Sequence, residues 1–177
     1  MQAQGSPGAG HGYLEGMAKI GVISDTHLPR GNRKIPGEVF SLFEGADLIL
    51  HAGDFVQAEV LYELGAIAPV KGVLGNCDTS ELARQVPIKE SIEVEGILIG
   101  MIHDSGDRQR RRKRMTEAFP GHRVVVFGHS HMPVIEDDGE LLLLNPGSAC
   151  DPRRAKIPTV ALLDITDGRP SARLVEL

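Results

Sequence analysis

The chain contains few aromatic residues and little sulfur. It has no tryptophan, two tyrosines and five phenylalanines among 177 residues, so its core must be mainly aliphatic. Its two cysteines, Cys77 and Cys150, are too few for the disulfide framework of a small secreted protein. No apolar run is long enough to span a bilayer, and the first sixteen residues lack the charged and apolar regions of a secretory signal. These absences predict a cytoplasmic protein without a membrane partner.

Positive charge is also in short supply. The formal net charge of −5 argues against a general nucleic-acid-binding protein, although a locally basic face remains open. Residues 1–16 are rich in Gly, Ala, Gln and Ser, which predicts a disordered extension or a stretch added to the natural protein. Residues 17–177 are enough for one domain with a substantial core.

What the chain does have is a repeated pattern of a buried apolar run followed at once by polar ligands. The clearest case is 123–127, a β-branched and aromatic run that precedes Gly128-His129-Ser130-His131. Strands that share a direction present such residues on one rim of a sheet, so we expect the sets to converge. The other four ligand sets are Asp25-Thr26-His27, Gly53-Asp54, Gly75-Asn76 and His103.

The order of the expected elements indicates the fold class. Residues 19–74 alternate strand, helix, strand, helix and strand, which favours right-handed crossovers and a largely parallel sheet. The second half is richer in strands, with a hairpin at Glu95-Gly96, a helix over 108–119 and a final hairpin at Asp167-Gly168. An α/β protein with two packed sheets and outer helices is therefore predicted.

The ligand set offers oxygen and imidazole nitrogen and needs no thiolate. Such a set suits Mn²⁺, Fe or Zn²⁺ better than a soft metal, and it is too rich in nitrogen for Ca²⁺ or Mg²⁺. Two ions about 3.5–4 Å apart would use all the ligands and would need one shared anion, for which Asp54 is the candidate. The seven candidates are Asp25, His27, Asp54, Asn76, His103, His129 and His131.

The five motifs, in this order and each after a strand, resemble those of the calcineurin-like metallophosphoesterases, and in particular the small YfcE-like phosphodiesterase branch. The resemblance covers residues 17–165, and the turn Asn145-Pro146-Gly147-Ser148 is similar to one that this branch carries late in its chain. It implies a four-layer αββα sandwich, with two mainly mixed sheets flanked by helices.

The resemblance also implies a dinuclear site with two divalent ions, Mn²⁺ foremost and Fe, Zn²⁺ or Ni²⁺ as alternatives. A water or hydroxide between the ions would attack phosphorus in line with the leaving oxygen. Asn76 and His103 would thus be catalytic residues in the sense that they hold an ion that activates this water. The first ion would be held by Asp25, His27, Asp54 and His131, and the second by Asp54, Asn76, His103 and His129.

Two positions depart from the family pattern. Many members have Gly-Asn-His, whose histidine contacts the phosphate or protonates the leaving group, whereas this chain has Cys77 and then Asp78. Asp78 is the nearest substitute for that general acid, and Cys77 is either a thiol lining the substrate site or inert. His103 is followed by Asp104 instead of the usual glycine, which bears on the shape of that loop.

The most concentrated charge lies in residues 108–114, which include five arginines. The default interpretation is a basic helix face that is exposed to solvent. The functional alternative is that Arg108 contacts the substrate phosphate. A nucleic-acid strip is a third option, weakened by the lack of interleaved aromatics. His51, inside an expected strand, is interpreted as a core or supporting histidine and not as a ligand.

These observations predict a metal-dependent phosphoesterase that acts on a small phosphate ester, with a preference for diesters. The first alternative is a catalytically weak binding scaffold, similar to the retromer subunit Vps29, which also lacks the histidine of Gly-Asn-His. The second is a nuclease of the same fold. A homo-oligomer is left open by the sequence.

Overall fold

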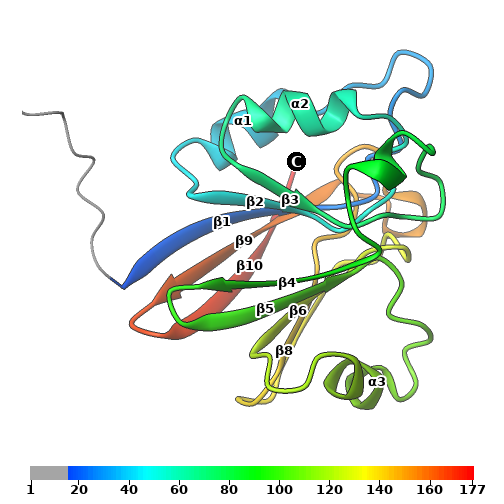
Figure 1. Cartoon of the computed structure of the whole chain (residues 1–177). Coiled ribbons are helices and arrows are strands. Elements are labelled where there is room, and N and C mark those ends of the chain that lie inside the picture. Colours follow the sequence, from blue (N-terminus) through cyan, green and yellow to red (C-terminus); the bar gives the residue numbers. More distant parts are fainter. Residues whose placement is uncertain (1–15) are drawn as a thin grey trace, which may run out of the picture.

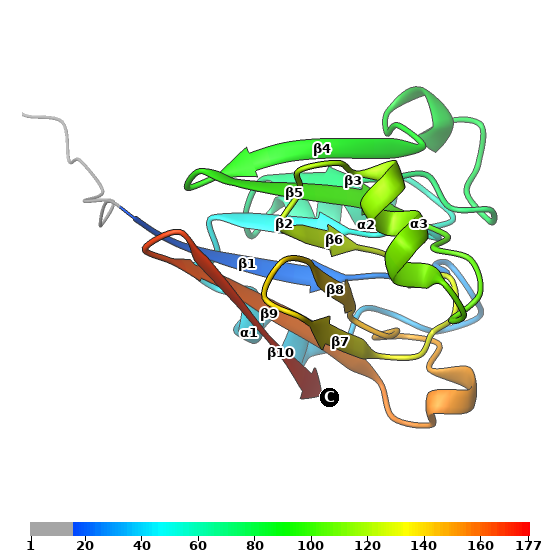
Figure 2. The ribbon, with the colours of Figure 1, turned by 90° about the horizontal axis from the view of Figure 1, so that it is seen from below.

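The computed structural model describes residues 16–177, so the expected extension lies almost entirely outside the described residues. Two five-stranded sheets stack on each other, with two helices over one outer face and one helix over the other (Figures 1 and 2). The predicted four-layer αββα sandwich is therefore confirmed. Within the described part of the chain, no helix combines the length and apolarity needed to cross a membrane.

The first sheet has the strand order β10-β9-β1-β2-β3. Its β1-β2 and β2-β3 pairs are parallel, as the alternation of strands and helices predicts, while β9 runs antiparallel to both of its neighbours. Helices α1 and α2 cover its outer face (Figure 1). The elements are β1 (Met17–Ile23), α1 (Gly37–Phe43), β2 (Leu48–His51), α2 (Glu59–Gly65), β3 (Val70–Gly72), β9 (Thr159–Thr166) and β10 (Arg169–Glu176).

The second sheet has the order β4-β5-β6-β8-β7 and is also mixed. Its β5-β6 and β6-β8 pairs are parallel, and the two edge pairs are antiparallel. Helix α3 covers its outer face (Figure 2). The elements are β4 (Lys89–Val94), β5 (Ile97–Ile102), α3 (Arg111–Ala118), β6 (Val124–Val126), β7 (Val134–Asp137) and β8 (Leu142–Asn145). Two short 3-10 helices, η1 (Leu82–Arg84) and η2 (Arg153–Ala155), lie in the connections from β3 to β4 and from β8 to β9.

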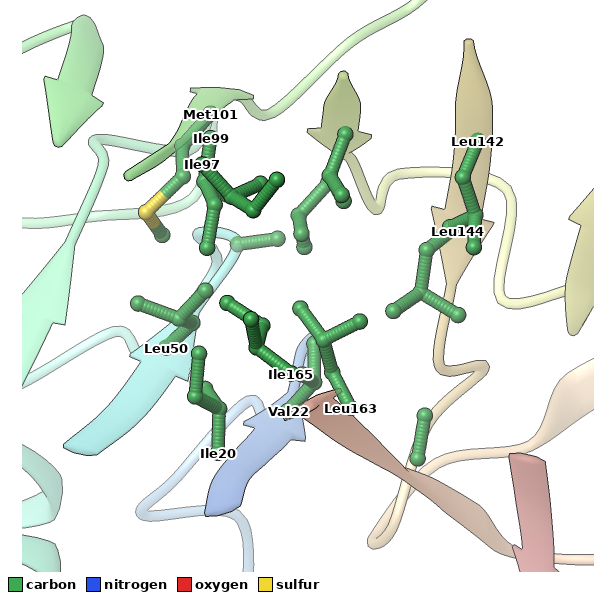
Figure 3. Packing of buried hydrophobic residues seen from close by; sticks show 14 of the residues in the cluster. Ile20, Val22, Leu50, Ile97, Ile99, Met101, Leu142, Leu144, Leu163 and Ile165 are labelled. Atoms are coloured by element: carbon green, nitrogen blue, oxygen red, sulfur yellow. The ribbon is translucent and has the colours of Figure 1, made fainter. Parts of the chain in front are cut away.

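An aliphatic core fills the space between the sheets (Figure 3). Ile20 and Leu50 of the first sheet are fully buried in it, as are Ile99 and Leu144 of the second. The outer layers are closed by phenylalanines, Phe43 from α1 and Phe119 from the end of α3, which fill space above glycines of β1 and β5. The buried phenylalanines thus lie in the outer layers, and the cluster between the sheets contains none.

The basic helix differs from its expected form. It was predicted over 108–119, but α3 begins at Arg111, because Arg110 has a left-handed backbone with φ of 60°. The expectation of a solvated basic face is wrong for Arg111, which is buried and lies 4.9 Å from the centre of the Phe127 ring. Arg112 and Arg114 donate to main-chain carbonyls of neighbouring segments, so much of this charge holds α3 in place.

Candidate metal centre

All five ligand motifs lie at one end of the sandwich, just past the carboxyl ends of their strands. Because β1 runs parallel to β2, and β5 to β6, the loops after these strands emerge at the same edge of each sheet. The two edges then face each other: the His129 amide donates to Oδ2 of Asp25 at 3.0 Å, and Nδ1 of His103 lies 2.7 Å from the carbonyl oxygen of Ala52. Residues more than a hundred positions apart in sequence are thereby brought into contact.

A first group of side chains gathers around His27. Its Nε2 lies 3.2 Å from Nε2 of His131 and 3.4 Å from Oδ2 of Asp54. The Nε2 of His131 lies 3.4 Å from Oδ1 of Asp25. Asp25, His27 and His131 are buried and present one ligand atom each within the reach of a single ion. This group has the composition that the sequence predicts for the first ion.

A second group shares Asp54 with the first. The Oδ2 of Asp54 is 3.4 Å from Nε2 of His103, the same distance that separates it from His27. Asn76 Oδ1 lies 3.1 Å from Nε2 of His103 and 3.0 Å from Nδ1 of His129. The seven predicted ligands therefore form two adjoining groups, with one carboxylate oxygen between them.

Main-chain carbonyls orient two of the imidazoles. Nδ1 of His103 lies 2.7 Å from the carbonyl oxygen of Ala52, and Nδ1 of His131 contacts that of Asp151. In both residues Nε2 faces the centre of the cluster, so a hydrogen on Nδ1 alone would leave the Nε2 lone pair available to a metal ion. Such outer contacts are typical of metal-ligating histidines.

The backbone around these residues is strained. Asp25, His27, Asp54, His129 and His131 all have positive φ, between 49° and 67°. Non-glycine residues adopt this conformation rarely, and it tends to persist where the surroundings impose it for function. Five of the seven predicted ligands share it, so the protein holds these side chains in place at a conformational cost.

Burial and neighbouring groups shift the pKa values of the two aspartates in opposite directions. Burial raises the pKa of Asp25 to about 7, whereas hydrogen bonds with His103 and the Cys77 amide overcome burial and hold the pKa of Asp54 well below its usual range. Burial lowers the pKa of His27 and of His131. Against burial, hydrogen bonds with Asp54 and the Ala52 carbonyl raise the pKa of His103. The ionised Asp54 carboxylate beside the imidazoles of His27 and His131 is donor chemistry that suits Mn²⁺, Fe²⁺ or Zn²⁺, so the residues fit a metal centre.

The departure at Cys77 and Asp78 has a structural explanation. The Asp78 carboxylate accepts three main-chain hydrogen bonds, from Gly75 at 2.7 Å, Val56 at 2.7 Å and Asp54 at 3.2 Å. It ties the loop after β2 to the loop after β3, which is the role of a positioning residue. The Cys77 amide donates to Oδ1 of Asp54 at 2.8 Å, and burial and the Asp54 carboxylate raise the pKa of its thiol.

A cavity of about 390 Å³ opens beside the second group. Its polar side is formed by Asn76, His103, Asp104 and His129, and its apolar walls by Leu74, Ile88 and Ile102. Ile88 is 71% exposed, an unusual degree for a large aliphatic residue. The cavity could take an apolar group attached to a phosphate at the ligand cluster. Arg108 is exposed, and within residues 16–177 its side chain forms no hydrogen bond or ion pair with the ligands.

Several supporting residues were not recognised in the sequence. Ser148, in the Asn-Pro-Gly-Ser turn, donates to the Asp25 carbonyl at 2.7 Å, and Asn145 donates to that of Gly128 at 2.8 Å. Arg153, in η2, has Nη2 3.3 Å from Nε2 of His27. The sequence signal for Arg153 is its place in a short basic segment, Arg153-Arg154, soon after the turn at 145–148.

His51 behaves as predicted for a supporting histidine. It is fully buried, its ring stacks on Phe55, and its Nε2 lies 3.2 Å from the hydroxyl of Thr26. Its Nδ1 accepts a hydrogen bond from the Gly53 amide at 3.2 Å. Both ring nitrogens are therefore used in holding the loops that carry Asp25, His27 and Asp54.

Comparison with known proteins agrees with this geometry. Residues 18–168 match the calcineurin-like phosphoesterase superfamily domain. A "Probable metallophosphoesterase" of Methanothermobacter thermautotrophicus is 39% identical over 160 residues, covering 88% of this chain and 91% of that protein. Phosphodiesterase YfcE of Escherichia coli K12 is 28% identical over 171 residues, covering 84% and 88%. The structure of Vacuolar Protein Sorting 29 from Cryptosporidium parvum shares the fold, with a TM-score of 0.75 at 19% identity over 92% of this chain and 98% of that one.

Proposed function

The chain belongs to the calcineurin-like phosphoesterase superfamily, and we propose that it is a phosphodiesterase that works with two divalent metal ions. The observation that carries the proposal is the position of Asp54 Oδ2, 3.4 Å from the Nε2 atoms of both His27 and His103. An anion between two cations offsets their mutual repulsion. Two ligand groups that meet at one carboxylate oxygen supply that arrangement.

The proposed ligands follow the two groups. Asp25, His27, Asp54 and His131 would hold one ion, and Asp54, Asn76, His103 and His129 the other. Bound there, the ions would generate a nucleophile from water near neutral pH and offset charge on the phosphoryl oxygens. The donors are nitrogen and oxygen only, which suits Mn²⁺, Fe, Zn²⁺ and Ni²⁺. Of these we take Mn²⁺ first, as the family resemblance implies.

The protein's own contribution is to orient the ligands and to shape the substrate site. The carbonyls of Ala52 and Asp151 fix the imidazoles of His103 and His131, and the Cys77 amide fixes Oδ1 of Asp54 so that Oδ2 faces the histidines. The apolar side of the 390 Å³ cavity would receive the leaving group. The Cys77 thiol, with its raised pKa, is a poor nucleophile and is assigned to the wall of the site.

A small phosphodiester with an apolar leaving group is the expected substrate, and the cytoplasm is the expected location. The basic run 108–114 does not favour a nucleic-acid substrate or a direct role for Arg108. Arg111 is buried, and Arg112 and Arg114 donate hydrogen bonds to main-chain carbonyls, so these charges hold the fold together. A binding scaffold remains the competing function. It would have no use for five strained ligand positions directed at one point.

The test is turnover of bis(p-nitrophenyl) phosphate and of p-nitrophenyl phosphate by purified protein with Mn²⁺, together with metal analysis. The proposal expects close to two ions per chain and faster hydrolysis of the diester. Absence of bound metal, combined with absence of turnover across Mn²⁺, Fe²⁺, Zn²⁺ and Ni²⁺, would reject it in favour of the scaffold.

A further inference from the structure

Three arginines converge on one carboxylate at the edge of the ligand cluster. Oδ2 of Asp151 lies 3.2 Å from Nη1 of Arg30 and 3.2 Å from Nε of Arg153, while Oδ1 lies 2.9 Å from Nη1 of Arg33. Arg30 and Arg33 come from the loop between β1 and α1, and Arg153 comes from η2. We call Arg30, Arg33 and Arg153 the arginine rim.

The arginine rim carries more positive charge than its partner can balance. One carboxylate faces three guanidinium groups, and the same two segments add Lys34, Arg154 and Lys156 on a chain whose net charge is −5. Glu59 and Glu63 share a small cavity with Arg33, but within residues 16–177 neither forms an ion pair with it. An uncompensated cluster of this kind attracts anions.

Stability alone does not account for the cluster. The three arginine side chains are 43% to 60% exposed, and exposed ion pairs contribute little to folding. Three cations around one anion also repel one another. The Asp151 side chain, in contrast, is only 10% exposed, so it acts as a fixed anchor that holds the guanidinium groups at the surface.

The arginine rim is connected directly to the ligand cluster. Arg153 spans the two, with Nε on Asp151 and Nη2 3.3 Å from Nε2 of His27. The main-chain carbonyl of Asp151 also accepts from Nδ1 of His131. Arg30 and Arg153 contact the same oxygen, Oδ2 of Asp151, so Arg30 lies close to Arg153 and hence near the ligand cluster.

We propose that the arginine rim is a second anion subsite, which binds a phosphate of the substrate other than the one that is hydrolysed. The substrate class is then a phosphodiester that carries an additional phosphate monoester. Guanidinium groups suit this ligand because they donate two parallel hydrogen bonds to phosphate oxygens. This inference rests on the proposed function, and it gives the substrate a direction: the anionic end lies toward His27 and the apolar leaving group toward Ile88.

Two substrates with the same scissile bond and leaving group test the proposal. Thymidine 5′-(p-nitrophenyl phosphate) has one phosphate, and its 3′-phosphorylated form has two. We expect the wild-type protein with Mn²⁺ to show a kcat/KM at least about tenfold higher for the second, since a charged hydrogen bond to phosphate is worth that much. In Arg30→Gln/Arg33→Gln the ratio should fall toward one. Arg169→Gln/Arg173→Gln, an equal change of charge on exposed residues of β10, should keep the wild-type ratio.

A binding measurement separates failure of the subsite from failure of the proposed function. Calorimetry with metal-free protein would compare thymidine 3′,5′-bisphosphate with thymidine 5′-monophosphate. Tighter binding of the bisphosphate, lost in Arg30→Gln/Arg33→Gln but kept in the β10 variant, supports the subsite even if no substrate is hydrolysed. Equal binding of both nucleotides by the wild-type protein, or a preference that survives the Arg30→Gln/Arg33→Gln change, overturns the subsite even if hydrolysis is fast.

Discussion

Oδ2 of Asp54 lies 3.4 Å from Nε2 of His103, although the two residues follow strands of different sheets. The contact is accompanied by a hydrogen bond from Nδ1 of His103 to the carbonyl of Ala52, 2.7 Å away. The two halves of the sandwich thus meet at the ligand cluster itself. The packing of the aliphatic core therefore sets the distances within the candidate metal centre.

Replacement of Asp54 should separate metal binding from folding. Asp54→Asn keeps the shape but removes the anion between the two groups, so we expect kcat/KM on bis(p-nitrophenyl) phosphate to fall by about 10³ or more. Bound metal should drop to one ion per chain or fewer. Asp164→Asn on β9, at the other end of the sheet, makes the same change of charge and should behave as wild type. Wild-type activity in Asp54→Asn would contradict the assignment of Asp54.

The raised pKa of Asp25 predicts a pH-dependent stability of the metal-free protein. Burial raises this pKa from 3.8 to about 7, so the folded state holds a proton that the unfolded state has lost over that range. The unfolding free energy contributed by Asp25 is then highest below about pH 4 and falls as pH rises to 7. Asp25→Asn mimics the protonated form and should be more stable than wild type at pH 8 in chelator, by an amount on the order of a few kcal/mol.

Urea unfolding of both proteins at pH 5 and pH 8 provides the measurement. The advantage of Asp25→Asn should shrink at pH 5, where most of the wild-type Asp25 is already neutral. Saturating Mn²⁺ at pH 8 should reverse the order, because only the wild-type protein gains the full binding energy of the first ion. An advantage that is absent at pH 8, or unchanged between the two pH values, would show that Asp25 does not carry the shifted pKa.

The sequence predicts the layers and the ligand types of this protein, because strand patterns and polar residues at strand ends are local features. It also predicts Asp54 as the shared ligand, but the approach of a single Asp54 oxygen to both His27 and His103 depends on how the two sheets pack. The positive φ of Asp25 and His129 is likewise imposed by tertiary contacts. Arg153 escapes prediction for the same reason: its neighbour His27 is 126 positions away.

Asp78 offers a test of whether the general acid lies beside Asn76. Its carboxylate is occupied by three main-chain donors, so we expect Asp78→Asn to lower the free energy of unfolding by about 1–3 kcal/mol. Its effect on kcat/KM should be the same for every aryl leaving group in a series of phosphodiesters. A variant that loses progressively more activity as the leaving group becomes more basic would instead identify Asp78 as the acid.

Gly128 packs against Ser24 and Asp25, which follow β1 of the other sheet, so a side chain at this position has no room. A Cβ at this position would lie 2.0 Å from the hydroxyl of Ser24 and 2.7 Å from Oδ2 of Asp25. Gly128→Ala must therefore push the loop of His129 away from Asp25, which accepts the His129 amide at 3.0 Å. We expect a loss of about 1–3 kcal/mol in the free energy of unfolding.

The matched control is Gly37→Ala at the start of α1, where a Cβ would meet nothing within 4 Å and the backbone φ is not positive. Alanine favours helix over glycine, so this variant should be as stable as wild type or slightly more stable. Because the displaced loop carries His129, Gly128→Ala should also weaken Mn²⁺ binding, while Gly37→Ala should leave it unchanged. Equal metal affinity in both variants would mean that the contact between the sheet ends does not position the ligands.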